Sequence, residues 1–173
     1  HSWSIVTGRG KIVLRSQARP YIALHRLDWA AHCRAVASRA GVATLDDEKA
    51  ATPADLIFDS RPPPVPDGMM LQHFLGLEVR SRRAIFDPEI AILMDFRVDQ
   101  SRGMHFIYLL PFSATDALVE STLFTPSVCP ESYYRGEITA YLEAHFGLDE
   151  FETLRTERLS LIHISEPTRP IDI

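Results

Sequence analysis

Hydrophobic and polar positions alternate most regularly between Ile90 and Phe124, and this two-residue period predicts three consecutive β-strands. The polar face of the first strand includes Asp95, which is expected to be an exposed or capping acid. Its apolar face comprises Ile90, Ile92, Met94, Phe96 and Val98. Met104–Leu110 is apolar on both faces except at His105, a pattern typical of a covered central strand. A lone histidine in such a strand favours a core residue whose ring nitrogens are both satisfied.

The third strand, Ala117–Phe124, carries Glu120 on an otherwise mostly apolar face. A carboxylic acid in apolar surroundings tends to keep its proton, because burial disfavours the charged form. Such an acid can protonate a weak base, for example a carbon–carbon double bond. The alternative is a structural acid paired with Arg97 or another base on a neighbouring strand.

The flanking segments predict a mixed α/β chain. A helix at Trp29–Ala40 is expected to be capped by Asp28 and ended by Gly41. An amphipathic helix is expected at Glu131–Phe146, ended by Gly147. The remaining expected elements are a hairpin at His1–Leu14, short strands at Val42–Leu45, Ala54–Asp59 and Leu71–Val79 (with Gly76 as a bulge), and a linker at Pro62–Gly68.

Composition narrows the class of protein. The 173 residues carry a formal net charge of −5 without a dense basic run, which argues against nucleic acid as a partner. Cys33 and Cys129 lie far apart, outside any metal-binding spacing, and are expected to be free thiols in a reducing compartment; no metal site is expected. The basic residues Arg80, Arg82 and Arg83 are typical of a solvated turn, with anionic lipid head groups as an alternative contact.

The last residues read differently from the rest. Leu159–Arg169, LSLIHISEPTR, resembles the conceptual translation of a transposase-end sequencing adapter. We therefore expect residues 159–173 to be a non-native tail, so that His163 and Glu166 form no site. The alternative is a genuine strand, LSLIHI, followed by a loop.

An ordered set of segments in residues 2–158 resembles the lycopene cyclase family of flavoproteins. The segments are DLIFDSRPP (55–63), LQHFLGLEV (71–79), FDPEIAILMDF (86–96), FIYLLPFS (106–113), ALVESTLF (117–124), SYYRGEITAYL (132–142) and RTER (155–158). The resemblance implies an α/β fold, similar to FAD-dependent hydroxylases, in which an antiparallel substrate-domain sheet (about residues 71–125) joins part of a Rossmann-type domain. Residues 1–158 are expected to be an internal fragment of that fold, because they contain no GxGxxG loop for the FAD pyrophosphate.

The resemblance also implies an activity. Family members cyclise the ψ-ends of lycopene, or of a similar acyclic carotenoid, to β-ionone rings, as intramolecular lyases or isomerases without net redox change. They use reduced FAD, with NAD(P)H as the source of electrons. They are expected to be cytoplasmic and to sit peripherally on the inner face of the membrane.

By position in the family's motifs, Glu120 is the acid, while Asp59 and Arg61 lie near FAD. A second acid that often follows the first is replaced here by Ser121, which weakens a mechanism with two adjacent carboxylates. Two alternatives remain. One is a related flavin-dependent reductase or monooxygenase acting on another isoprenoid; the other is a truncated fragment without activity of its own.

Overall fold

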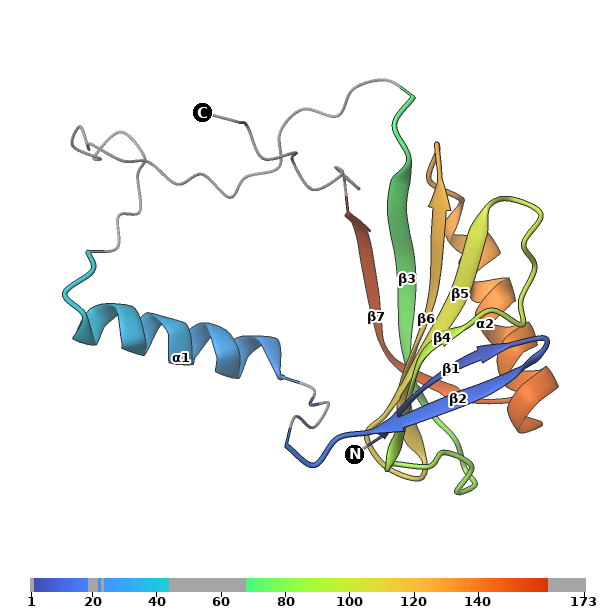
Figure 1. The fold of residues 1–173 in the computed structure, drawn as a ribbon, viewed down its shortest axis with the longest axis horizontal. Coiled ribbons are helices and arrows are strands. Elements are labelled where there is room, and N and C mark those ends of the chain that lie inside the picture. Colours follow the sequence, from blue (N-terminus) through green and yellow to red (C-terminus); the bar gives the residue numbers. More distant parts are fainter. Residues whose placement is uncertain (1, 19–21, 23, 44–67, 162–173) are drawn as a thin grey trace. The chain divides into compact units, whose positions relative to one another are not determined.

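The computed structural model describes residues 2–18, 22, 24–43 and 68–161 (Figure 1). It divides into two compact units, Ile22–Pro63 and a second made of His1–Tyr21 together with Pro64–Ile173. Within the first unit the described part is essentially one helix, and the second unit contains the sheet. The expected strand at Ala54–Asp59 and nearly all of the linker at Pro62–Gly68 lie outside the described residues.

Helix α1 spans Arg26–Arg39 and begins earlier than the sequence predicts. The backbone N–H of Trp29 donates to the carbonyl oxygen of His25 at 3.0 Å, so His25 is the N-cap. Asp28 is therefore not the cap but lies in the first helical turn, where a carboxylate is favoured by the helix dipole. Gly41 follows the helix with a φ of +74°, as expected of a residue after a helix end.

The sheet has seven strands in the order β2-β1-β4-β5-β6-β3-β7 (Figure 1). Every neighbouring pair is antiparallel except β1 and β4, which are parallel. The class is the mixed α/β one that the sequence predicts. The strands are β1 (Ser2–Thr7), β2 (Gly10–Arg15), β3 (Leu71–Arg80), β4 (Ile90–Asp95), β5 (Met104–Pro111), β6 (Asp116–Thr125) and β7 (Glu152–Leu161).

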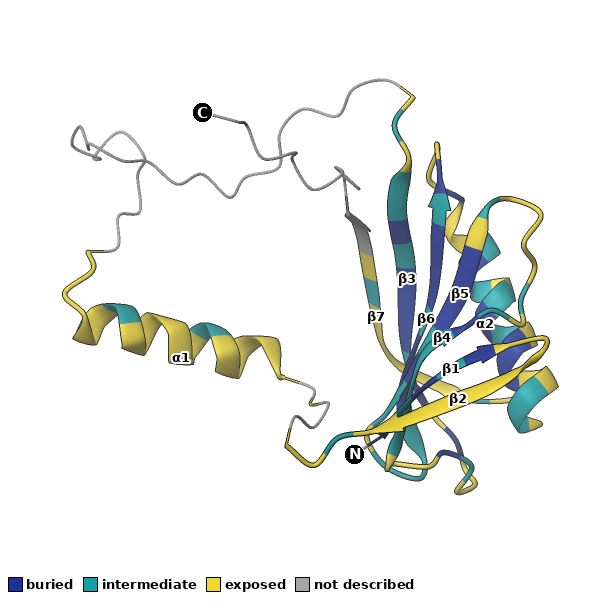
Figure 2. Cartoon of the chain, in the orientation of Figure 1, coloured by how far each residue is buried: buried dark blue, intermediate teal, exposed yellow. Residues whose placement is uncertain are grey.

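Helix α2 (Glu131–Phe146) covers one face of this sheet. Both of its predicted ends are confirmed, and Gly147 closes it in the left-handed conformation with a φ of 58°. One side of α2 is buried against odd-numbered positions of β3, β5 and β6, and Figure 2 shows these strands as the most deeply buried part of the sheet. The helix residues in this core are Tyr134, Ile138, Tyr141 and Leu142.

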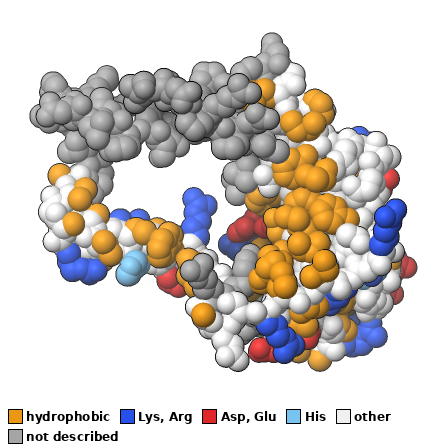
Figure 3. All heavy atoms as spheres, in the orientation of Figure 1, with side chains coloured by type: hydrophobic (Ala, Val, Ile, Leu, Met, Phe, Trp, Pro, Cys, Tyr) orange, Lys and Arg blue, Asp and Glu red, His pale blue; other side chains and the backbone are white. Residues whose placement is uncertain are grey.

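The opposite face of the sheet, here called the open face, carries the even-numbered positions of the same strands. Three of its aromatic rings pack together: the centroid of Phe106 lies 5.5 Å from that of Phe96 and 6.1 Å from that of Phe124. Figure 3 shows hydrophobic side chains gathered in a band over this face. Glu120 belongs to the open face, because it lies two residues from Thr122, which pairs directly with Phe106.

Asp95 was expected on a polar, exposed face, and this expectation is wrong. Ile92 pairs with Leu109, and Asp95 pairs with Ile107, so β4 contains one more residue than β5 between these two pairs. Such an irregularity shifts the alternation by one position. Asp95 therefore faces α2 and is fully buried.

Gly76 was expected to form a bulge, and this expectation is also wrong. The pairing of β3 with β6 runs without a shift from Leu71 to Arg80, and Gly76 pairs regularly with Glu120. Strand β7 includes Leu159–Leu161, the first residues of the expected non-native tail, while residues 162–173 lie outside the described part.

Candidate functional site

Glu120 lies near the middle of β6, with a strand on each side. It is directly opposite Tyr108 of β5 and directly opposite Gly76 of β3. A Cβ atom built on Gly76 would lie 3.0 Å from Cγ of Glu120 and 3.3 Å from its Oε1. The Glu120 side chain therefore extends over β3, into the space that a larger residue at position 76 would fill.

Burial raises the pKa of the Glu120 carboxyl to about 7, and the nearby carboxylate of Glu157 adds to the effect. The alternative of an ion pair with Arg97 is not what the structure contains, since Arg97 binds Asp95 instead. Among the residues that the structure describes, the charge acting on Glu120 is thus a second acid rather than a base. The Glu120 carboxyl therefore keeps its proton to a higher pH than an exposed glutamate does, as a proton donor requires.

This titration has a consequence for stability. The folded chain holds the Glu120 proton up to about pH 7, whereas the unfolded chain loses it near 4.5, so the free energy of unfolding falls as pH rises between these values. Above pH 7, ionisation of a fully buried group with this pKa shift destabilises the folded chain by about 3 kcal/mol. For Glu120, which is only partly buried, the destabilisation is about 2 kcal/mol.

We therefore expect Glu120→Gln to stabilise the chain by about 2 kcal/mol at pH 8 and to have little effect at pH 4. Urea unfolding of both proteins across this pH range measures the difference. A difference that stays constant with pH would show that Glu120 does not titrate as described.

A buried polar cluster lies on the opposite face, beneath α2. The carboxylate of Asp95 accepts hydrogen bonds from Arg97, at 2.9 Å from Nε and 2.6 Å from Nη2, and from the hydroxyl of Tyr141 at 2.8 Å. Burial opposes ionisation of Asp95, but these hydrogen bonds outweigh it and lower the pKa. The cluster joins β4 to α2, and the Asp95 carboxylate and the Tyr141 hydroxyl bind each other within it, so we assign it a structural role.

His105 is the satisfied core residue that the sequence predicts. Its Nδ1–H donates to the carbonyl oxygen of Asp99 at 2.9 Å, and its Nε2 accepts from the hydroxyl of Ser121 at 2.8 Å. Burial lowers the pKa of His105, in keeping with a neutral ring. Ser121 thus faces α2, so an acid at position 121 would point away from Glu120.

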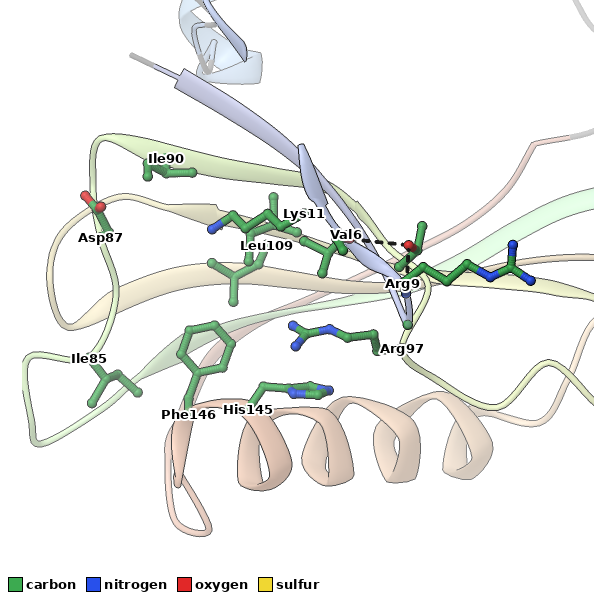
Figure 4. A pocket seen from close by; sticks show the side chains of 14 residues that line it. Val6, Arg9, Lys11, Ile85, Asp87, Ile90, Arg97, Leu109, His145 and Phe146 are labelled. Carbon is green, nitrogen blue, oxygen red and sulfur yellow. Dashed lines mark hydrogen bonds between the residues drawn. The ribbon is translucent and has the colours of Figure 1, made fainter. Parts of the chain in front are cut away.

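A cleft of about 660 Å³ lies elsewhere, beside the β1–β2 hairpin. Figure 4 shows the Arg97 side chain between this hairpin and His145 of α2. The lining combines the cations Arg9, Lys11 and Arg97 with apolar side chains, among them Phe146, and does not include Glu120. Glu120 therefore lies on the open face of the sheet rather than in this cleft.

Of the other residues singled out in the sequence, the structure describes the two cysteines but not the four that follow. Asp59 and Arg61, expected near FAD, lie outside the described residues, as do His163 and Glu166. Cys33 is exposed and Cys129 is buried, both as free thiols. The described residues contain no group of three metal-ligating side chains.

The basic turn is solvated, as expected, since Arg80, Arg82 and Arg83 are all exposed, and two of them also bind the sheet unit. Arg80 binds Asp116 through Nε at 2.6 Å, and Arg83 donates to the carbonyl oxygen of Gly147. Within the described part of the chain, no helix combines the length and apolar character needed to span a membrane.

Two residues of the site were not found from the sequence. Glu157 was noted only as part of the RTER motif, and Gly76 was assigned a bulge. Both residues are found only from the register of β3 with β6 and β7, which places Gly76 and Glu157 in one row with Glu120. The sequence of one segment does not contain this register.

Among solved structures, the fold is similar to that of a geranylgeranyl bacteriochlorophyll reductase-like protein from Thermoplasma acidophilum, with a TM-score of 0.60 and 12% sequence identity. The match covers 93% of this chain and 49% of that protein, so the chain spans about half of its length. At this identity, the likeness concerns the fold.

Among curated proteins, the chain is 43% identical over 54 residues to a lycopene beta-cyclase from Paracoccus sp. (strain N81106 / MBIC 01143). The aligned stretch is 31% of this chain and 14% of that relative. The family model for lycopene cyclase proteins matches residues 26–168. Since this match covers most of the sequence, the chain belongs to the lycopene cyclase family.

Proposed function

We propose that this chain provides the substrate-facing sheet of a lycopene beta-cyclase, and that Glu120 is the acid that starts ring formation. The observation that carries the proposal is a largely buried carboxyl group on an apolar sheet face, in a chain of the lycopene cyclase family, and this burial raises its pKa to about 7. The similarity to the Paracoccus lycopene beta-cyclase supports the same substrate class.

The reaction is an isomerisation. The Glu120 carboxyl gives its proton to the terminal carbon–carbon double bond of the polyene, which leaves a tertiary carbocation and a carboxylate. The neighbouring double bond attacks this cation and closes a six-membered ring, and a proton lost from the ring carbon restores a double bond. One proton is gained and one is lost, so the reaction has no net redox change.

The apolar residues of the open face suit this chemistry. Water would capture the carbocation, so a cyclase has to exclude it around the acid. Glu120 lies next to Leu118, which is 8% exposed, and Thr122, which is 1% exposed. The Phe96–Phe106–Phe124 group continues the apolar surface away from the acid toward β4. We propose that the polyene lies against this surface with one end at Glu120.

The cofactor and location belong to the same proposal. Reduced FAD, with NAD(P)H as the source of electrons, rests on the family resemblance, since Asp59 and Arg61 lie outside the described residues. A peripheral position on the inner face of the membrane rests on the solubility of the substrate, because an acyclic carotenoid is dissolved in lipid.

A second candidate is a related flavin-dependent reductase or monooxygenase acting on another isoprenoid. The shared fold with a geranylgeranyl bacteriochlorophyll reductase-like protein is the observation in its favour. A third candidate is that the chain, at about half the length of that protein, has no activity without further residues.

Product analysis separates these candidates. A full-length gene carrying this sequence is expressed, the cell extract is incubated in heavy water with unlabelled lycopene under reducing conditions, and the carotenoids are analysed by mass spectrometry. Cyclisation adds one solvent deuteron per ring and displaces one hydrogen, whereas a reductase adds two hydrogens to a double bond and a monooxygenase adds oxygen. Unchanged lycopene from the full-length gene, or a reduced or oxygenated product, would overturn the proposal. The 173-residue chain, expressed alone in parallel, tests the third candidate.

A further inference from the structure

We propose that Glu157 on β7 is a positioning residue for the acid: its carboxylate holds the proton on Glu120 across the gap that Gly76 leaves in the sheet surface. This inference rests on the proposed function, since it concerns how the proton donor is kept ready. Its geometry, however, is independent of which substrate the protein uses.

The three residues form one row across three strands. Gly76 of β3 pairs with Glu120 of β6 on one side and with Glu157 of β7 on the other. Directly paired residues project from the same face of a sheet, so both carboxylates stand on the open face. Helix α2 covers the other face and does not separate them.

Gly76 allows the two acids to approach each other. A Cβ at position 76 would lie 3.3 Å from Oε1 of Glu120, which places this carboxyl oxygen above the glycine rather than above β6 alone. Any side chain at position 76 would stand between the two carboxylates. The Leu118 side chain also reaches this space, with its Cδ1 3.3 Å from the same Cβ position, so Gly76 leaves room for the Glu120 carboxyl on the side of the sheet toward β7.

The local charges favour a proton on Glu120. Arg155 is the base next to this row: its Nη2 lies 2.8 Å from Oε1 of Glu157, and its Nε lies 3.1 Å from Oε2 of Glu78. The Arg155 guanidinium thus forms ion pairs with two carboxylates, those of Glu157 and Glu78. Glu120 is a third carboxyl group on the same face. A proton on Glu120 removes the excess negative charge.

The neighbours of Glu120 on β5 and β6 are neutral side chains. Tyr108 faces it from β5, and Leu118 and Thr122 flank it on β6. Across β3, the charged groups on the same face are Glu78 and, farther along, Arg80, which is engaged with Asp116. Ser121, the residue after Glu120, faces α2 and forms a hydrogen bond with His105, so position 121 does not supply a second acid on the open face. In this proposal Glu157 is the second acid.

A direct titration tests the pairing. The chain is prepared with ¹³C-labelled glutamate carboxyl groups, the Glu120 resonance is assigned by its loss in Glu120→Gln, and its pKa is measured by NMR. We expect Glu157→Gln to lower the pKa of Glu120 by roughly 0.5 to 1, while Glu157→Asp, which keeps the charge, restores most of it.

The matched control is Glu152→Gln, which removes one charge from the same strand at a position paired with Arg80. Arg80 lies four residues from Gly76 along β3, which corresponds to about 13 Å, so this variant is expected to change the pKa of Glu120 much less. An unchanged Glu120 pKa in Glu157→Gln, or an equal fall in both variants, would overturn the inference.

The activity of the full-length protein separates this inference from the proposed function. Cyclisation needs protonated Glu120, so its rate falls as pH rises through the pKa of that group. Glu157→Gln is expected to move this fall to lower pH by the same roughly 0.5 to 1, with KM unchanged. A shifted pKa by NMR in a protein that forms no rings would contradict the proposed function and leave the acid pairing intact. Ring formation with an unshifted profile would contradict the pairing alone.

Discussion

Replacing Glu120 with Gln in the full-length protein is expected to lower the rate of ring formation at least about 100-fold, the usual contribution of a general acid. The amide is nearly the same size as the acid and fits beside Gly76, but it has no proton of suitable acidity. KM is expected to change little, because the apolar contacts with the substrate remain. Initial rates of conversion of lycopene, measured by chromatography under reducing conditions, check this result.

Two comparisons make the outcome specific. Glu152→Gln removes a carboxylate from β7 on the same face of the sheet, where Glu152 pairs with Arg80 of β3. This variant is expected to keep nearly the full rate. Unfolding of Glu120→Gln at pH 8 is expected to need more urea than that of the wild type, which excludes loss of the fold as the cause. Retention of more than a third of the rate in Glu120→Gln would rule out Glu120 as the proton donor.

The elements that were predicted correctly are those set by local patterns. Helix α2 begins at Glu131 and ends at Phe146, because its apolar side has a helical period and Gly147 takes the left-handed conformation. Likewise, the alternation in Ala117–Phe124 correctly separates the residues that face α2 from those on the open face, which include Glu120. Each of these features depends on side chains within a few residues of one another.

The errors arose where strand pairing decides the result. Asp95 follows the alternation of its own strand in the sequence, but the irregular pairing with β5 between Ile92 and Asp95 turns it toward α2. Gly76 has the composition of a bulge, but its partner Glu120 lies 44 positions away, and only the pairing shows that the glycine makes room for that side chain. Glu157 is found by the same register. No local period contains such information.

The buried position of Asp95 leads to the second large effect. Asp95→Ala is expected to lower the free energy of unfolding by about 3 kcal/mol at pH 7. The change removes the acceptor of Tyr141, whose hydroxyl is buried, and the partner of Arg97. The larger losses seen for fully buried ion pairs are not expected, because the Arg97 side chain is 37% exposed and can turn toward water. Urea unfolding, with the exposed Asp149→Ala as the control, measures the difference.

The dependence of this effect on pH gives a further check of its cause. The pKa of Asp95 is lowered in the folded chain, so its contribution is fully present above the ordinary value of 3.8 and is lost as pH falls below it. The difference between wild type and Asp95→Ala should therefore shrink toward acidic pH, whereas the effect of Glu120→Gln grows toward alkaline pH. The two carboxylates lie on opposite faces of one sheet and differ in their surroundings. Hydrogen bonds from Arg97 and Tyr141 favour the charged form of Asp95, whereas burial and the nearby Glu157 disfavour the charged form of Glu120. If the Asp95→Ala difference stayed constant down to pH 3, its stabilisation would come from packing and not from the charged hydrogen bonds.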